Sequence, residues 1–274
     1  MKRAAAVAML LVVAAAIGYG AYRVVYHEAH VQPAIVTPQM DAQQAISPSL
    51  AGHIKRLLNE NVRYGDRAGR PKLIALTFDD GPYPVFTPLL LDALQRLNVH
   101  ATFFLIGRDA EEWPDLALRI ERSGNEVADH TYTHPNLDQE TAAQVRGEIE
   151  LGGKVLYRLV RDPAVFGLFR PPHGRYTTQT IKVAQSLGYK TVLWNDDAGD
   201  WRPASTAPAL AEHLEQHATA PEIVLLHSGR LATIEMLPEV VARFRAAGYT
   251  FVTVSQLLAA VKPPELNHPA KHAV

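Results

Sequence analysis

Acidic, histidine and arginine side chains recur along the chain where short apolar segments end. Five groups share this position: Asp79 with Asp80, His130 with His134, Arg170, Asp197 with Asp200, and His227. Carboxylates and imidazoles bind divalent metals and transfer protons in catalysis. Two histidines and one carboxylate would leave coordination positions open for water and substrate, which is typical of a catalytic rather than a structural zinc site. The pattern therefore predicts a catalytic metal site, provided that the fold brings these segment ends together.

Three of these groups also have a plainer interpretation. Asp79 and Asp80 precede Gly81-Pro82, a common turn composition. Arg170 could be a surface residue before a rigid turn, and His227 could be a core histidine with its hydrogen bonds satisfied. We favour a site because all five groups follow successive apolar segments, which is improbable as coincidence.

Three pairs of histidines have the spacing His-x3-His, so this spacing alone decides nothing. His213 and His217 lie in a helical pattern, where such a pair most simply occupies the solvent face, and we expect no carboxylate at a neighbouring strand end to join them. His268 and His272 flank a proline near the C-terminus. We therefore assign the metal site to the remaining pair, His130 and His134.

Alternating strand and helix patterns from Lys72 onward must position these groups. The expected strands are Leu73–Phe78, Thr102–Ile106, Glu126–Asp129, Phe166–Phe169, Thr191–Trp194, Ile223–Leu226 and Thr250–Val254. The expected helices are Phe86–Leu97, Leu116–Ser123, Glu140–Val160, Thr178–Leu187, Ala209–His217 and Leu237–Ala247. This alternation predicts an α/β fold, a barrel of about seven parallel strands. The rival, an open doubly wound sheet, lacks its glycine-rich turn, because Phe78-Asp-Asp-Gly-Pro82 follows the first strand. In parallel barrels the active site lies at the carboxyl ends of the strands, where the polar groups fall.

Composition excludes several classes of protein. Of 274 residues, 47% are hydrophobic and 20% charged, so the chain can bury a sizeable core. The net charge is −1, and residues 1–23 hold three basic and no acidic side chains, which leaves −4 for the remainder. A nucleic-acid partner is therefore not expected, since it requires a basic face. The absence of cysteine excludes thiol catalysis, cysteine-ligated zinc and disulfides.

The N-terminus has the pattern of an export signal. Lys2-Arg3 precedes an uncharged stretch over residues 4–22 that would span about 28 Å as a helix, close to the thickness of a bilayer core. We expect residues 1–23 to be a signal-anchor rather than a signal peptide cleaved after Ala14-Ala-Ala16, because the run stays apolar beyond that point. The protein would then be anchored in the inner membrane facing outward, or secreted if cleaved. Residues 24–50 are expected to form a spacer, 51–262 a catalytic domain and 263–274 a loose tail.

The motifs from residue 72 to 262 resemble those of polysaccharide deacetylases with a NodB-homology domain, carbohydrate esterase family 4. Five segments match in order: Thr77-Phe-Asp-Asp-Gly-Pro82, His130-Thr-Tyr-Thr-His134, Arg170-Pro-Pro-His-Gly174, Asp197-Ala-Gly-Asp-Trp201 and Leu225-Leu-His227. Each motif alone is weak, whereas five in order are highly specific. One departure is visible, because His173 replaces the usual tyrosine of the third motif.

The resemblance implies a distorted barrel and a role for each matched position. Asp80, His130 and His134 would hold a divalent metal, zinc in the first place with cobalt or a similar ion as the alternative. Asp79 would be the base that activates water, oriented by Arg170, and His227 the acid that protonates the leaving amine, with Asp200 beside it. The backbone N–H of His173 would bind the oxyanion, and Trp201 and Leu225 would wall the substrate pocket.

The function implied is a metal-dependent hydrolase that removes N-acetyl groups from an N-acetylhexosamine polysaccharide. Peptidoglycan, chitin oligomers, exopolysaccharides and O-acetylated xylan remain open as substrates. A glycoside hydrolase is an alternative, but its paired carboxylates would leave His130, His134 and Arg170 without a role. A non-catalytic glycan-binding module, using exposed aromatics such as Trp113, is a second alternative. A serine esterase is disfavoured because the chain has no Gly-x-Ser-x-Gly.

Overall fold

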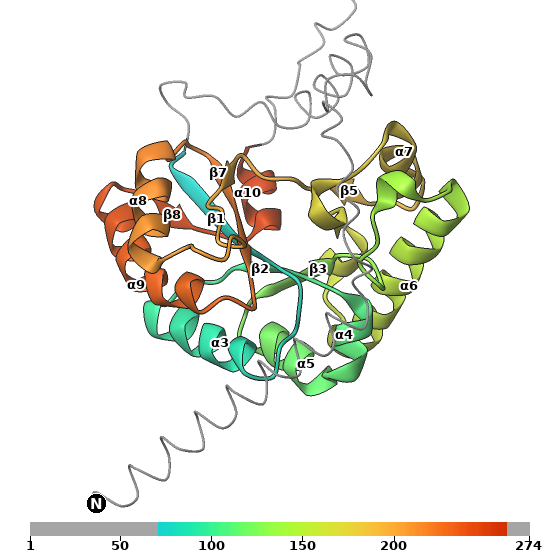
Figure 1. Cartoon of the computed structure of the whole chain (residues 1–274), viewed down its shortest axis with the longest axis horizontal. Coiled ribbons are helices and arrows are strands. Elements are labelled where there is room, and N and C mark those ends of the chain that lie inside the picture. Colours follow the sequence, from blue (N-terminus) through green and yellow to red (C-terminus); the bar gives the residue numbers. More distant parts are fainter. Residues whose placement is uncertain (1–70, 262–274) are drawn as a thin grey trace, which may run out of the picture. The chain divides into compact units, whose positions relative to one another are not determined.

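The computed structural model describes residues 71–261 (Figure 1). The expected anchor over 1–23, the spacer over 24–50, the first part of the catalytic domain and the tail over 263–274 lie outside these residues, as do His268 and His272. Among residues 71–261, no helix has the length and apolar character needed to cross a membrane.

A single parallel sheet forms the centre of the fold. Its strands are β1 Leu73–Asp79, β2 Thr102–Leu105, β3 Glu126–Asp129, β4 Leu168–Phe169, β5 Lys190–Thr191, β6 Asp196–Asp197, β7 Glu222–His227 and β8 Thr250–Phe251. Seven strands follow one path in the order β5-β4-β3-β2-β1-β7-β6, and β8 pairs with the start of β1. The sheet curls into a half-barrel, so the prediction of a distorted α/β barrel of about seven strands is confirmed.

The register of β1 and β7 places two site residues opposite each other. These strands pair continuously from Ile74 and Glu222 to Asp79 and His227. Both strands are almost wholly buried, which explains their uninterrupted apolar sequences. The last residues of the two central strands are therefore neighbours at the carboxyl edge of the sheet.

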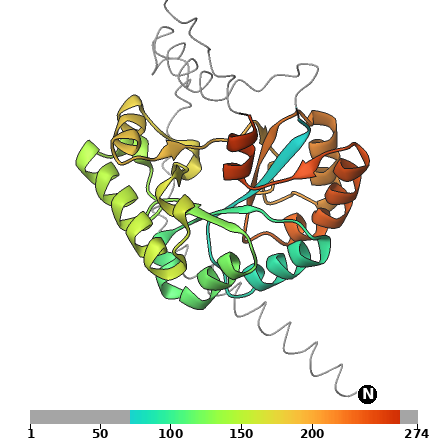
Figure 2. The same cartoon turned by 180° about the vertical axis from the view of Figure 1, so that it is seen from behind.

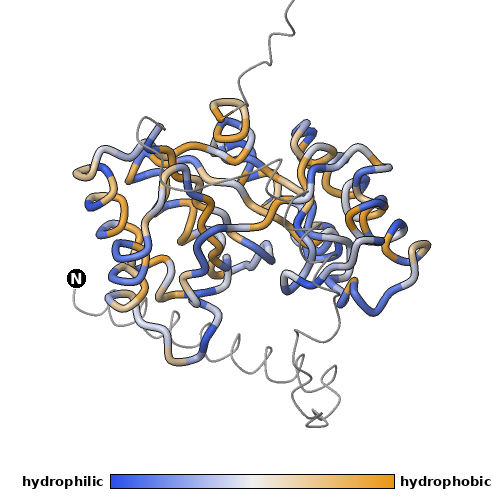
Figure 3. Tube along the Cα trace, turned by 90° about the horizontal axis from the view of Figure 1, so that it is seen from above, coloured by the Kyte–Doolittle hydropathy of each residue, from blue (hydrophilic) through white to orange (hydrophobic). Residues whose placement is uncertain are grey.

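Helices cover the outer face of the sheet, as Figures 1 and 2 show from opposite sides. They are α3 Phe86–Leu97, α4 Gly107–Glu112, α5 Pro114–Arg122, α6 Ala142–Val160, α7 Thr178–Ser186, α8 Ala207–His217 and α9 Leu231–Ala246. The helix α10 Val254–Ala260 packs instead against the other face, because its Val254 and Leu257 join the cluster that contains Ala75 and Phe104. Short 3₁₀ turns are η1 Leu137–Gln139, η2 Pro163–Phe166 and η3 Pro172–Gly174. Packed pairs link the helices in the succession α8, α9, α3, α5, α6 and α7. Figure 3 shows apolar and polar residues alternating along them, as expected of helices with one face on a core.

The alternation of side chains along β1 separates the apolar core from the site. Ile74, Leu76 and Phe78 belong to the large cluster that the sheet shares with its helices. Ala75 belongs to a smaller cluster that also contains Phe104 and Ala128. Because side chains in a strand alternate between faces, Asp79 projects on the same side as Ala75, away from the large cluster.

Three predicted strands were too long, and each has a local physical reason. The segment predicted as Phe166–Phe169 begins as η2, where the Asp162 side chain accepts from Ala164 N–H. The strand predicted over Thr191–Trp194 ends at Thr191, and the next two carbonyl oxygens accept from the guanidinium of Arg170. The strand predicted over Thr250–Val254 ends at Phe251, because Thr253 caps α10.

Other elements were missed or displaced. The strand β6 and the helices α4 and α10 were not predicted, and α9 begins at Leu231 rather than at Leu237, with Pro238 inside it. The new strand matters for the site, because Asp197 ends β6 and Asp200 follows it, rather than both following the fifth predicted strand. The polar groups still converge at the carboxyl ends of the strands, as predicted.

Candidate metal and catalytic site

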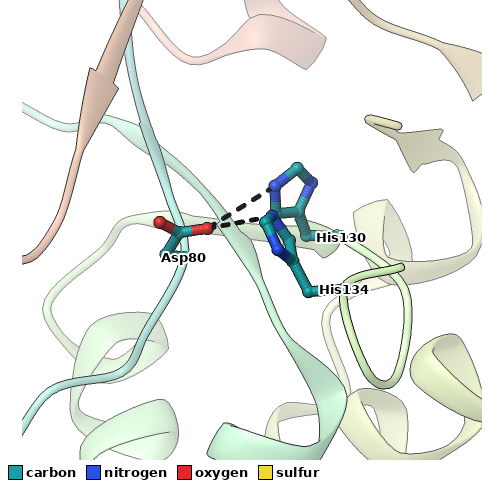
Figure 4. A group of neighbouring side chains, drawn as sticks. All are labelled: Asp80, His130 and His134. Atoms are coloured by element: carbon teal, nitrogen blue, oxygen red, sulfur yellow. Dashed lines mark ion pairs between the residues drawn. The ribbon is translucent and has the colours of Figure 1, made fainter. Parts of the chain in front are cut away.

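Asp80, His130 and His134 form a compact cluster of metal-ligating atoms (Figure 4). The Oδ1 atom of Asp80 lies 3.7 Å from His130 Nε2 and 3.3 Å from His134 Nε2. One ligand atom from each residue lies within 4.8 Å of the others, and among residues 71–261 no other group of three such residues meets this spacing. Two imidazole nitrogens and a carboxylate oxygen that converge in this way suit a divalent cation such as zinc.

Hydrogen bonds fix how His130 faces the cluster. Its Nδ1 lies 2.8 Å from the carbonyl oxygen of Arg170. A carbonyl can only accept, so Nδ1 carries the proton and Nε2 presents its lone pair to the cluster. Burial lowers the pKa of His130 well below its ordinary value, as do the neighbouring imidazole and guanidinium. The ring is therefore neutral, which is the form that binds metal.

Asp79 and Arg170 form an ion pair beside this cluster. Arg170 Nη1 donates to Asp79 Oδ1 over 2.6 Å and to Thr77 Oγ1 over 2.7 Å. The Arg170 side chain has no exposed surface, and its guanidinium carbon lies 4.0 Å from the centre of the Phe104 ring. The interpretation of Arg170 as a surface residue is therefore wrong. Burial raises the pKa of Asp79, and the charge of Arg170 opposes that rise.

The adjacent carboxylates have different partners, as expected for neighbouring side chains that diverge. The second oxygen of Asp79 lies 3.7 Å from His130 Nε2, whereas Asp80 faces both imidazoles of the cluster. Asp79 is almost fully buried and Asp80 is partly exposed. The two aspartates thus occupy distinct positions, one inside the barrel against Arg170 and one toward solvent.

On the other side of Asp79, His227 is held by Asp200. The backbone N–H and Nδ1 of His227 lie 2.8 and 2.7 Å from the two oxygens of the Asp200 carboxylate. Burial alone would lower the pKa of His227, but the hydrogen bond that its ring donates to Asp200 and the charges of Asp80, Asp200 and Asp79 outweigh burial and raise the pKa to about 9. His227 is therefore a cation at neutral pH, with Nε2 free to donate a proton.

Two residues of α9 and the loop before it, which sequence reasoning missed, hold Asp200. Thr233 Oγ1 donates to Asp200 Oδ2 over 2.6 Å, and the hydroxyl is buried. Arg230 Nε donates to the carbonyl oxygen of Asp200 over 2.9 Å, and its Nη2 donates to that of Trp201. The sequence offered no clear signal for Thr233, since α9 begins earlier than its pattern indicated.

The predicted substrate-binding residues lie in different surroundings. The His173 ring packs edge-on against His134, with centroids 4.4 Å apart, so the histidine that replaces the usual tyrosine contacts the cluster directly. Trp201 is half exposed, and its Nε1 lies 3.5 Å from Asp197 Oδ2. Leu225 is buried in β7 and pairs in register with Thr77, so little of it is accessible to a ligand.

One expectation about the idle histidines is wrong. His213 has a carboxylate partner, because the unpredicted β6 places Asp196 Oδ1 2.9 Å from His213 Nε2. His217 Nδ1 instead contacts the carbonyl oxygen of its neighbour one turn earlier. Glu222, at the start of β7, is fully buried near Asp196, and burial together with the neighbouring Asp196 carboxyl raises its pKa to about 9.

The loops of the site contain residues in the left-handed backbone region. Four non-glycine residues there have positive φ: Asp80 at 69°, Thr131 at 70°, His134 at 65° and His173 at 57°. This conformation is unfavourable for residues with a β-carbon and persists only where surrounding structure imposes it. Part of that structure is a pair of hydrogen bonds, in which Thr131 N–H donates to Asp129 Oδ1 and His134 N–H donates to Thr131 Oγ1.

The fold and the cluster together define an α/β enzyme whose site lies at the carboxyl ends of barrel strands. Residues 66–192 match the family model for polysaccharide deacetylase. A peptidoglycan-N-acetylglucosamine deacetylase of Bacillus cereus is 36% identical over 192 residues, which cover 68% of this chain and 88% of that protein. The chain therefore belongs to the polysaccharide deacetylase family, carbohydrate esterase family 4, as its motifs predicted.

Two solved structures place the fold within this family. The crystal structure of a peptidoglycan N-acetylglucosamine deacetylase in complex with an N-hydroxybenzamide derivative has a TM-score of 0.65 and 32% identity over 68% of this chain and 88% of that one. A pseudoenzyme of the same family from Bacillus anthracis has a TM-score of 0.66 and 26% identity over 72% and 68%. Because the fold also occurs without activity, the side chains of the site carry the functional argument.

Proposed function

We propose that this protein is a metal-dependent deacetylase that removes N-acetyl groups from the N-acetylglucosamine of peptidoglycan. The observation that carries the proposal is the arrangement around Asp79: a metal-ligating cluster on one side and a protonated His227 on the other. Hydrolysis of an amide needs a base for water and an acid for the leaving amine. This site offers both, on adjoining strands.

The residues present fit a zinc-like cation. Asp80, His130 and His134 provide one carboxylate oxygen and two imidazole nitrogens, the donor set of catalytic zinc sites. A bound cation of this kind would lower the pKa of water and polarise the acetyl carbonyl. The hydrogen bond between His130 and the Arg170 carbonyl is the outer support that metal-binding histidines usually have.

Asp79 accepts the proton of the attacking water in this mechanism. Its Oδ1 is occupied by Arg170, which leaves Oδ2, on the side of His130, for the water. Burial makes the carboxylate more basic than an exposed one, while Arg170 keeps it ionised. The backbone N–H of His173 donates to the oxyanion that develops on the acetyl group.

His227 then donates its proton from Nε2 to the amine that leaves. Asp200 holds the other ring nitrogen, which fixes both the orientation and the charge of the imidazole. The order of events follows from the protonation states: Asp79 begins without a proton and His227 begins with one. Trp201 borders this side of the site and offers a partly exposed indole to a sugar ring.

Measuring acetate release from a panel of substrates tests the proposal. The panel contains peptidoglycan glycan strands, chitin tetrasaccharide and O-acetylated xylan at equal acetyl concentration, with Asp79→Asn as the inactive control. We expect release from the N-acetylated substrates, fastest from peptidoglycan, and none with Asp79→Asn. Release from xylan alone would contradict N-deacetylation. Cleavage of glycosidic bonds without acetate release would favour the glycoside hydrolase, and binding without turnover the glycan-binding module.

We also propose that residues 1–23 remain attached and hold the catalytic domain at the outer face of the inner membrane. The support is the length of the apolar run over residues 4–22, which exceeds the roughly 7–15 residues that a cleaved signal needs. A flexible spacer of about 25 residues gives a reach near 25–30 Å. N-terminal sequencing of the native protein decides the matter, since a soluble chain beginning near Ile17 means that the segment is removed.

A further inference from the structure

A small groove lies beside the position of His227, between the loop after β6 and the start of α9. Its volume is about 170 Å³, and it is lined chiefly by Asp200, Arg202, Ser205, Gly229, Arg230 and Leu231. Asp200 connects the groove to the catalytic centre, because its carboxylate holds His227. A group bound here would therefore lie near His227, on the side of its Nδ1.

The side chains that line the groove carry a net positive charge, because Arg202 and Arg230 outnumber the single carboxylate of Asp200. The Asp200 carboxylate is already engaged by His227 and Thr233, and both oxygens of nearby Asp197 accept from Gly199 and Trp201. Within the described part of the chain neither Arg202 nor Arg230 forms an ion pair, although most other arginines near carboxylates do. The Arg202 guanidinium is thus available to an anion, whereas that of Arg230 already donates to the carbonyl oxygens of Asp200 and Trp201.

The Arg202 side chain is held in place by contacts other than hydrogen bonds. Its guanidinium lies over the Trp201 ring, 5.2 Å from the ring centre. It also lies against Gly199, where an added β-carbon would come within 3.2 Å of the guanidinium carbon. Gly199 has φ +71°, which a residue with a side chain rarely adopts. The guanidinium fork is therefore positioned before a ligand arrives, which reduces the entropic cost of binding.

We propose that this groove binds a carboxylate carried by the glycan next to the sugar that is deacetylated. The inference rests on the proposed function and specifies its substrate class as an acidic rather than a neutral polymer. A planar guanidinium and a carboxylate form paired, charge-assisted hydrogen bonds. Trp201 and Leu231, each about half exposed at 50% and 52%, provide apolar surface beside the charges for the sugar ring.

Peptidoglycan meets this requirement and chitin does not. Its strands alternate N-acetylglucosamine with N-acetylmuramic acid, whose lactyl group ends in a carboxylate when no peptide is attached, whereas chitin is uncharged. When a peptide is attached, the carboxylates belong to the peptide instead. The two sources offer the same chemistry to Arg202, and they can be separated by substrates with and without the peptide.

The test compares wild type, Arg202→Gln and Arg202→Lys on matched tetrasaccharides. One is chitin tetrasaccharide, one an alternating peptide-free peptidoglycan tetrasaccharide, one the same with its lactyl carboxylates converted to amides, and one with peptides attached. The readout is the ratio of kcat/KM for the acid to that for the amide. Arg122→Gln on α5 is the control, because Arg122 is exposed and distant in the fold.

We expect the acid to be preferred over the amide by about tenfold in wild type, the value of one good charge-assisted interaction. Arg202→Gln should bring this ratio close to one, Arg202→Lys should leave part of it, and Arg122→Gln should not change it. The preference should also weaken at high salt. A preference confined to peptide-bearing strands would assign the carboxylate to the peptide.

Two failures can be told apart. If wild type releases acetate from all four substrates with the same kcat/KM for acid and amide, the groove does not bind a carboxylate and this inference is wrong. If wild type releases no acetate from any of them, the proposed function itself fails. An acid preference that survives unchanged in Arg202→Gln would place the recognition elsewhere.

Discussion

Arg170 contacts both halves of the catalytic centre, because its guanidinium bonds Asp79 over 2.6 Å while its carbonyl oxygen accepts from His130 over 2.8 Å. One residue therefore sets the position of the proposed base and the orientation of a proposed metal ligand. Its guanidinium also fills the interior below the site, between Phe104 and the carbonyl oxygens of Val192 and Leu193. The chemistry and the packing of the barrel meet at this side chain.

Replacing Arg170 should reduce both activity and stability. Arg170→Gln leaves Asp79 buried without its counter-charge, which typically costs about 3–5 kcal/mol. Arg170→Lys retains a charge but cannot reach Asp79, Thr77 and the two carbonyl oxygens at once, so it should be less destabilised, with kcat lowered by about a hundredfold. Urea unfolding and steady-state kinetics measure the two effects. Near-normal kcat in the folded lysine variant would remove Arg170 from the mechanism.

The metal-ligand assignment predicts a separation between binding and turnover. Asp80→Ala and His134→Ala should lose the cation, whereas Asp79→Asn should retain it and be inactive, since its partner is Arg170 rather than the cluster. Elemental analysis after dialysis against zinc or cobalt measures the stoichiometry, and a chelator should abolish wild-type activity. Full activity of metal-free protein would overturn the assignment.

The pair His213 and His217 provides the control for that experiment. His213 contacts Asp196 and lies in α8, outside the ligand cluster. The double variant His213→Ala, His217→Ala should therefore keep one bound metal and normal turnover per folded molecule. Loss of the metal in a variant whose circular dichroism is unchanged would mean that the wrong pair was chosen.

Activity should fall at alkaline pH as His227 loses its proton. The active form is protonated, and the pKa is raised to about 9, so activity persists up to that region and declines above it. A cation on Asp80 would cancel part of the negative charge that raises this pKa, so the decline in the loaded enzyme should begin somewhat lower. Asp200→Asn removes the largest of the effects that raise the pKa of His227. The alkaline decline in activity should therefore move to lower pH by roughly 1–3 pH units in this variant.

Thr233→Val tests the same network without touching the reacting groups. The change removes the hydroxyl that donates to Asp200 Oδ2 and keeps the side-chain shape. Asp200 then becomes more basic and less well oriented, so kcat should fall by about tenfold while the pH limb stays at or above its wild-type position. Thr233→Ser, which restores the donor, should recover most of the activity.

An alkaline decline in the activity of Asp200→Asn identical to that of wild type would mean that His227 is not the acid.

The buried carboxyl pair at the opposite end of β7 should make stability depend on pH. The pKa of Glu222 rises from 4.5 to about 9 on folding, so the folded chain keeps a proton that the unfolded chain loses, and stability falls as pH rises between these values. Glu222→Gln cannot ionise, and it should be more stable than wild type by about 1–3 kcal/mol at pH 8, with little difference near pH 4. Urea unfolding at both pH values measures this, with exposed Glu235→Gln as the control. Parallel pH profiles for the two proteins would contradict the protonated state.

The sequence predicts the central strands and the convergence of the site well, because both depend on local signals. The apolar runs of β1 and β7 end at Asp79 and His227, and parallel pairing then places these residues side by side. The short strand β6 has no such signal, since Asp196-Asp197 reads as a turn, and the contact with His213 could not be foreseen without it. The helix α10 had a readable signal, the capping box of Thr253 and Gln256, which was overlooked.

Long-range partners were the least predictable part of the site. Arg170 was assigned from its motif to orient Asp79, but its contacts with Val192 and Leu193 depend on where β5 stops. Thr233 and Arg230 follow no motif, and they reach Asp200 only because α9 begins at Leu231. Such bonds join residues that tertiary packing alone brings together.

The positive φ angles of Asp80, Thr131, His134 and His173 limit how this domain could become more thermostable. A glycine at any of these positions would relieve backbone strain of order 1 kcal/mol, yet at Asp80 or His134 it would also delete a proposed metal ligand. Selection for stability and selection for catalysis therefore act in opposite directions on the same codons. Heat-resistant descendants of this chain should keep those residues and accumulate their stabilising substitutions in the outer helices, far from the carboxyl edge of the sheet.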